Sequence, residues 1–169
     1  HASMPIGGYS EKQIMPQDKL VSVPDGVSNE VASCIVLKGM TAEYLLHRSY
    51  VAKKGDKVLF HAAAGGVGQI LCQWANAIGC TVIGTVGSKE KEAIAKNNGC
   101  HHVINYTDNN FVEEVEKIVG KNGIDVVYDG VGTKTFEGSI ECLKIRGMMV
   151  AFGNASGYVH TLDIKKHIN

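Results

Sequence analysis

The sequence lacks an excess of charge of either sign and closely spaced cysteines, and its first residues show no pattern typical of a secretory leader. Seventeen Lys and Arg residues balance seventeen Asp and Glu residues among 169, so we expect no nucleic-acid partner and no anionic membrane surface. No C-x-x-C pair is present, which is typical of reduced, mostly buried thiols. The N-terminus shows no basic region followed by an apolar one, so we expect no signal peptide and a cytoplasmic protein. The five cysteines are Cys34, Cys72, Cys80, Cys100 and Cys142.

Charged residues are also missing from Val58 to Ser88, a stretch long enough to cross a membrane. Its polar residues and repeated glycines argue against a membrane helix. Residues 58–60 are an apolar run typical of a buried strand, and apolar residues from 67 to 78 recur at helical spacing. Gly79 then predicts a helix C-cap, and a β-branched run from 81 predicts a second strand. The stretch therefore predicts a βαβ unit.

The same alternation continues along the chain. Apolar spacing and glycines predict further helices that end at Gly99, Gly120 and Gly147, and strands at 102–104, 124–128 and 148–152. Upstream of residue 58, two short helices are predicted, with Ser28 and Thr41 as possible N-caps. Alternating strands and helices predict an α/β fold with a doubly wound parallel sheet, the Rossmann fold.

The turn between the first strand and its helix is rich in glycine. In Ala62–Gly68, Ala63 replaces the first glycine of G-x-G-x-x-G, while Gly65 and Gly68 fill the other two places. Gly65 would let the backbone approach a pyrophosphate, and Gly68 would let the helix pack close to the strand. This context favours a dinucleotide site, and the alternative is a tight turn without a ligand.

The second strand ends without the acidic residue that binds the ribose of NAD. Gly87 stands there instead, followed by Ser88 and Lys91, so there is room and positive charge for the 2′-phosphate of NADPH. The alternative is that the lysines belong to a solvated helix turn, because Glu90 and Glu92 accompany them. Tyr106, after the third strand, is predicted to lie against the adenosine or to pack within the protein.

Strand ends further along the chain supply other candidates. The backbone near Gly130 is predicted to face the cofactor, and Asp129 beside it is a possible helix N-cap. Polar residues after the fifth strand could bind a carboxamide; this segment contains Phe152, Gly153, Asn154 and Ser156. His61 is predicted to be a packed histidine rather than a catalytic one. His101 and His102 are adjacent and would point to opposite faces, so no metal site is expected, and no catalytic side chain is assigned.

These residues resemble the zinc-independent quinone oxidoreductases, the zeta-crystallin-like branch of the medium-chain dehydrogenase/reductase superfamily. The resemblance covers nearly the whole chain and is carried by residues 38–42, 61–68, 84–87, 103–106, 127–129 and 152–156. It implies hydride transfer from NADPH to a quinone, with a homodimer as the full enzyme. It also implies that Thr41 and Asn154 lie near the nicotinamide and that Gly66 and Val67 lie at the pyrophosphate. Gly87, Lys91 and Tyr106 match the adenosine-phosphate pocket.

The resemblance further implies a second, catalytic domain, most of which this chain lacks. We expect residues 1–4 to be a cloning remnant, 5–36 an edge of the catalytic domain, 37–157 the dinucleotide-binding domain and 158–169 a return segment. Two other functions stay open: the cofactor domain of an NADPH-dependent enone or enoyl reductase, and a non-enzymatic NADPH-binding or RNA-binding protein. The neutral charge weakens RNA binding.

Overall fold

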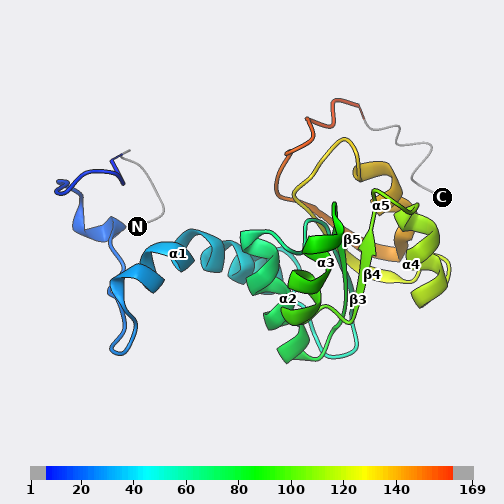
Figure 1. Ribbon diagram of the computed structural model, residues 1–169, viewed down its shortest axis with the longest axis horizontal. Helices are drawn as coiled ribbons and strands as arrows, with labels where there is room; N and C mark the ends of the chain where they lie inside the picture. Colours follow the sequence, from blue (N-terminus) through cyan, green and yellow to red (C-terminus); the bar gives the residue numbers. More distant parts are fainter. Residues whose placement is uncertain (1–6, 162–169) are drawn as a thin grey trace.

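A parallel β-sheet with helices on both faces forms the body of the protein (Figure 1). The computed structural model describes residues 7–161, and within them the sheet has five strands in the order β3-β2-β1-β4-β5, all parallel. The chain moves outward from β1 in one direction through β3, then returns to the other side of β1 as β4. The doubly wound fold is thereby confirmed. The strands are β1 (Lys57–Phe60), β2 (Thr81–Val86), β3 (His102–Asn105), β4 (Ile124–Asp129) and β5 (Leu143–Ala151).

Alternate side chains of each strand enter two separate cores, because successive residues point to opposite faces. In β1, Val58 and Phe60 join a cluster with the helices α1, α2 and α3, whereas Leu59 joins a cluster with α4 and α5. Both faces are therefore apolar, which explains why the strands are continuous hydrophobic runs. The helices are α1 (Asn29–Tyr44), α2 (Gly66–Ile78), α3 (Lys89–Asn97), α4 (Phe111–Val119) and α5 (Phe136–Cys142); Gln17–Lys19 is a 3₁₀ turn.

Two predicted boundaries are wrong. Residues 29–44 form one continuous helix through Gly39, followed by a π-helical turn, Leu45–Ser49, in place of two short helices. Thr41 is not an N-cap, because its hydroxyl donates to the carbonyl of Leu37 at 2.8 Å inside the helix. Ser28 is a cap, as predicted, and its Oγ accepts from the N–H of Val31. Gly147 does not end α5; it lies within β5, where the pairing with β4 shifts register.

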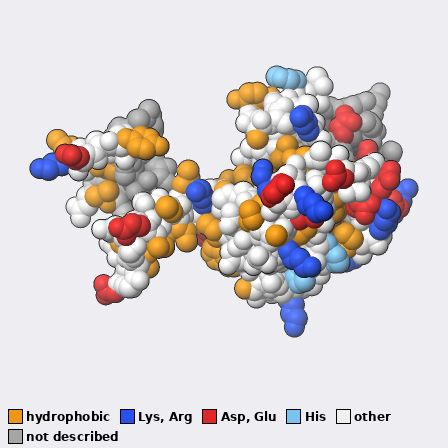
Figure 2. Space-filling view, in the orientation of Figure 1, with side chains coloured by type: hydrophobic (Ala, Val, Ile, Leu, Met, Phe, Trp, Pro, Cys, Tyr) orange, Lys and Arg blue, Asp and Glu red, His pale blue; other side chains and the backbone are white. Residues whose placement is uncertain are grey.

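The N-terminal part of the described chain projects away from the sheet as an arm, residues 7–36, which includes the first half of α1 (Figure 1). Its surface carries many apolar side chains (Figure 2), among them Val21, Val23, Val31 and Ile35, which are exposed. Within residues 7–161, no helix has both the length and the apolar character needed to cross a membrane.

Tyr128, in β4, is the largest fully buried side chain, and its hydroxyl has no hydrogen-bond partner among the described residues. A buried polar group without a partner costs free energy, so Tyr128→Phe should raise the free energy of unfolding by about 1 kcal/mol in urea titrations. Tyr50→Phe is the matched control, because the Tyr50 hydroxyl donates to Asp56 Oδ2 at 3.1 Å. That variant should be destabilised. Equal losses in the two variants would contradict the assignment of Tyr128.

Candidate functional site

The turn after β1 is held in a compact shape by its own backbone. Ala62 has φ 60°, a left-handed conformation rare for a residue other than glycine. The N–H of Ala63 donates to the carbonyl of Thr85 at 2.9 Å, and that of Gly65 donates to the carbonyl of Ala62 at 2.8 Å. A Cβ at Gly68 would lie 2.5 Å from the carbonyl oxygen of Ala63. The helix therefore approaches the chain closely at this glycine, as predicted, although the contact is with the turn that follows the strand and not with the strand itself.

The first turn of α2 opens directly from this loop, with exposed Gly65 as its N-cap. The N–H groups of a first helical turn have no intrahelical acceptor, and here they belong to Gly66, Val67 and Gly68. No acidic residue occupies this turn. Unpaired N–H groups and the positive end of the helix dipole together favour an anion at this position.

Helix α1 lies against α2 and brings Thr41 to the same part of the molecule. Ala42, next to Thr41, is fully buried in the core cluster that also contains Ala63 of the turn. Thr41 itself is half-buried. Its placement agrees with a position beside the turn, although its hydroxyl already donates within the helix.

At the end of β2, Gly87 and Tyr106 are in close proximity. A Cβ at Gly87 would lie 2.6 Å from the Tyr106 hydroxyl oxygen, and Tyr106 is exposed on its other side. Ser88 is the N-cap of α3, and Lys91 is exposed on the first turn of that helix. The Ser88 hydroxyl is hydrogen-bonded to Glu90, which lowers the pKa of that carboxyl. The end of β2 thus presents a glycine, an aromatic ring and a cation on one open rim.

The loops after β4 and β5 touch each other. A Cβ at Gly153 would lie 2.8 Å from the carbonyl oxygen of Gly130, and a Cβ at Gly130 would lie 3.0 Å from the ring of Phe152. The Ser156 hydroxyl donates to the carbonyl of Val131 and accepts from the N–H of Lys134, so it ties the two loops together. Asn154 is exposed. A hollow of about 350 Å³ opens between the loops, and its lining includes Phe152, Gly153 and Asn154.

A buried hydrogen-bond network lies beneath these loops. His61 is fully buried; its Nδ1 lies 2.8 Å from Thr85 Oγ1, and its Nε2 lies 2.8 Å from Ser139 Oγ. The Ser139 hydroxyl donates to the carbonyl of Thr135, so it accepts from Nε2–H of a neutral imidazole. Burial lowers the pKa of His61 to about 4, and the charge of Asp129 opposes this effect. His61 is thus a packed histidine, as predicted.

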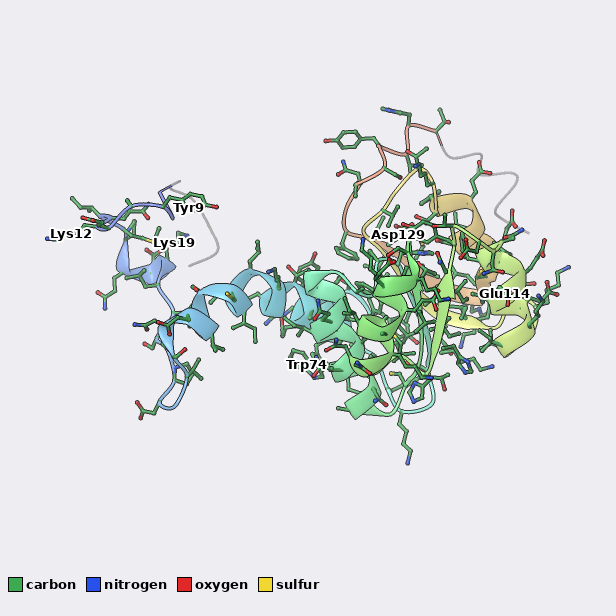
Figure 3. All side chains as sticks on the ribbon, in the orientation of Figure 1. Tyr9, Lys12, Lys19, Trp74, Glu114 and Asp129 are labelled. Atoms are coloured by element: carbon green, nitrogen blue, oxygen red, sulfur yellow. The ribbon has the colours of Figure 1, made fainter. Side chains whose placement is uncertain are left out.

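Asp129 ends β4 inside the body of the protein, beneath the loops (Figure 3). Its Oδ1 accepts from the N–H groups of Val131 and Gly132 at 2.7 and 3.0 Å, and its Oδ2 accepts from the Thr135 hydroxyl at 2.8 Å. Asp129 therefore shapes the loop before α5 and is not its N-cap, which is Thr135. Sequence spacing does not reveal this network, because its members come from the turn after β1, from β2, from β4 with the loop that follows it, and from α5.

The predicted site residues thus fall into three groups along the carboxyl ends of the strands: the glycine turn with Thr41, the rim at Gly87, and the loops after β4 and β5. In the described part of the chain, no group of three or more His, Cys, Asp or Glu side chains is arranged to hold a metal ion.

The sequence is similar to those of known oxidoreductases. The sequence is 48% identical over 162 residues to the 2-haloacrylate reductase of a Burkholderia species, covering 95% of this chain and 49% of that protein. It is 46% identical over 164 residues to quinone oxidoreductase 1 of Escherichia coli K12, covering 97% of this chain and 50% of that protein. The chain therefore spans about half the length of these relatives.

Solved structures show the same likeness. A crystal structure of Escherichia coli quinone oxidoreductase complexed with NADPH matches with a TM-score of 0.84 and 47% identity, covering 88% of this chain and 46% of that one. A crystal structure of 2-haloacrylate reductase matches with a TM-score of 0.92 and 45% identity, covering 97% of this chain and 52% of that one. The resemblance to the quinone oxidoreductases is thereby confirmed. Residues 66–168 match the family described as zinc-binding dehydrogenases, and the chain belongs to this family.

Proposed function

We propose that this chain is the NADPH-binding part of an oxidoreductase that reduces a quinone. The observation that carries the proposal is the glycine turn after β1, whose helix α2 opens with unpaired N–H groups and no acidic residue in its first turn. At the nearby end of β2, Gly87 stands where an NAD-binding site would have an acidic residue. When bound, NADPH supplies a hydride. The chain's own residues bind and orient the cofactor.

Each of the three groups of residues binds a different part of NADPH. Gly65, Gly66 and Val67 receive the pyrophosphate, because their backbone is open and the first turn of α2 attracts anions. Gly87, Ser88, Lys91 and Tyr106 receive the adenosine and its 2′-phosphate, with the tyrosine ring against the adenosine. Thr41, Gly130, Phe152, Gly153, Asn154 and Ser156 surround the nicotinamide. Since the Ser156 hydroxyl is engaged between the loops, its part is to position them, and the exposed Asn154 amide is the better donor to a carboxamide.

The arm supports the proposed division into domains. Its exposed apolar side chains flank a groove of about 600 Å³ between the segment before α1 and the helix itself. Apolar surface of this extent favours a covering partner. We assign residues 5–36 to the edge of a catalytic domain, 37–157 to the cofactor domain and 158–169 to the return segment. The 36/37 boundary lies within the continuous helix α1. For the parent enzyme, a homodimer and a cytoplasmic location are part of the proposal.

A second candidate substrate class is an activated alkene, because a 2-haloacrylate reductase is as similar to this chain as the quinone oxidoreductases are. The two candidates differ in the acceptor, whose pocket would involve the other half of the parent protein. Turnover of a quinone and of a 2-haloacrylate by the full-length protein, with NADPH as donor, separates them. Faster turnover of the haloacrylate would overturn the quinone assignment and leave NADPH binding in place.

Removing the Lys91 ammonium group at the end of β2 should lower the preference of the chain for NADPH over NADH. Lys91→Ala should weaken NADPH binding by roughly ten-fold, because a charge-assisted contact to the 2′-phosphate is lost, and should leave NADH binding nearly unchanged. Isothermal titration calorimetry with both cofactors measures this.

The matched control is Lys96→Ala, which removes a lysine from the last turn of the same helix. It should leave both affinities as they are. An NADPH-to-NADH affinity ratio that is the same in Lys91→Ala as in the unaltered chain would contradict the assignment of the rim.

A further inference from the structure

Lys38, on α1, lies across the first turn of α2. A Cβ at Gly66 would lie 2.6 Å from Lys38 Cε, 2.7 Å from its Cδ and 3.3 Å from its Nζ. Gly66 is the first residue of α2 after the N-cap Gly65. The lysine stem therefore occupies the space that a side chain at residue 66 would fill, and the exposed Lys38 side chain places its ammonium group beside the turn.

This placement is unfavourable for a cation in the absence of an anion. The N-terminus of a helix carries the positive end of the helix dipole, which repels an ammonium group. No acidic residue in the first turn of α2 offsets the repulsion, and no ion pair of Lys38 is present within residues 7–161. The Lys38 ammonium group and the positive end of the α2 dipole repel each other when the turn is empty. An anion bound at the turn would be attracted by both groups at once.

The helix α1 presents Lys38 and Thr41 together. Residues three apart lie on the same face of a helix, and the resemblance places Thr41 near the nicotinamide. Ala42 and Leu45 of the same segment are fully buried in the cluster that contains Ala63, so this part of α1 is fixed against the turn. Lys38 thus stands on a rigid support between the glycine turn and the nicotinamide side of the site.

We infer that Lys38 binds the pyrophosphate of the dinucleotide as its side-chain counter-ion, with its flexible stem lying over Gly66. The inference rests on the proposed function. It assigns to α1 a charged contact that the G-x-G-x-x-G pattern does not include. Because NADH and NADPH share the pyrophosphate, Lys38 strengthens the binding of both, whereas Lys91 serves only NADPH.

The test measures the affinity of NADPH and NADH for Lys38→Ala and Lys38→Gln by calorimetry at two salt concentrations. Both variants should lose roughly ten-fold in affinity, by the same factor for each cofactor, because one charge-assisted contact is removed. The affinity should also depend less steeply on salt, since one fewer ionic contact is screened. Lys38→Arg should restore most of the loss.

Lys54→Ala is the matched control. Lys54 is exposed and packs on the other terminal glycine of the same helix, with its Cγ 3.0 Å from a Cβ built at Gly79. It lies at the C-terminal end of α2, so its removal should leave both affinities unchanged. Thermal unfolding of each variant verifies that the fold is retained.

The results that would overturn the role of Lys38 differ from those that would overturn the proposed function. Unchanged affinities in both Lys38 variants, a loss confined to NADPH, or an equal loss in Lys54→Ala would overturn the role of Lys38 and leave the proposed function standing. Failure of the unaltered chain to bind either cofactor at millimolar concentration would overturn the proposed function and this inference with it.

Discussion

Gly68→Ala should destabilise the protein and weaken NADPH binding together. The new Cβ would lie 2.5 Å from the carbonyl oxygen of Ala63 and 2.7 Å from that of Ala62, and these backbone atoms cannot move without reshaping the turn. Overpacking of this kind costs about 1–3 kcal/mol. Urea unfolding should report that loss. Displaced N–H groups in the turn should weaken NADPH binding by roughly ten-fold or more, measured by calorimetry.

Gly66→Ala is the matched control for stability, because it adds the same methyl group two residues away. Its Cβ would meet only the flexible end of Lys38, so the side chain can move aside. Replacing glycine with alanine where the backbone suits an L-residue also lowers the conformational entropy of the unfolded chain, which favours the folded state by about 0.4–1 kcal/mol. Gly66→Ala should therefore be as stable as the unaltered protein or more so. If Gly68→Ala is equally stable, the close packing of α2 on the turn does not constrain the fold.

Acid should destabilise the protein through His61, and this loss should begin at a higher pH than the protonation of most carboxylates. Burial lowers the pKa of His61 to about 4 in the folded protein, against about 6.5 in the unfolded chain. Above pH 6.5 the imidazole is neutral in both states. Between pH 6.5 and 4 the unfolded chain binds a proton that the folded protein does not, so stability falls as the pH falls. The loss between pH 7.5 and 4.5 should be about 2.5 kcal/mol.

Urea unfolding at pH 7.5 and 4.5 measures this loss, and His61→Gln identifies its source. The variant should be less stable at pH 7.5, because the bridge between Thr85 and Ser139 is weakened, but should lose much less on acidification. His102→Gln is the control, since His102 is exposed at the start of β3 and its variant should keep the full loss. An equal acid sensitivity of His61→Gln and the unaltered protein would rule out His61 as the titrating group. Burial raises the pKa of Asp125, but the hydrogen bonds from Lys144 and from the Lys57 N–H outweigh this effect and leave the pKa lowered, so the stability that Asp125 contributes is lost mainly below this pH range.

The local patterns of the sequence were sufficient to predict the sheet. Continuous apolar runs such as 58–60 are typical of strands buried on both sides, and the two cores explain that pattern. The boundaries that failed depend on contacts between distant residues. α1 continues through Gly39 because its second half packs on α2, which outweighs the weak helix propensity of glycine. Gly147 lies in β5 because pairing with β4 extends that strand back to Leu143.

Those parts of the candidate site that lie within one short segment of the chain could be predicted from the sequence. The glycine turn and the absence of an acid at Gly87 are both visible in short stretches. Lys38 is separated from Gly66 by 28 positions, and only the packing of α1 on α2 brings them together. The network of His61, Ser139 and Asp129 likewise joins residues that no spacing rule connects.

The central claim is that NADPH lies with its pyrophosphate on the glycine turn and its 2′-phosphate at the rim of β2. A nuclear magnetic resonance titration of the ¹⁵N-labelled chain with NADPH tests it most directly, because each backbone amide reports separately. The amides of residues 65–68 and 87–91 should shift together as NADPH is added, and with NADH the shifts at 87–91 should be much smaller. Shifts confined to other segments, or no shifts at 65–68 at saturating NADPH, would contradict the account.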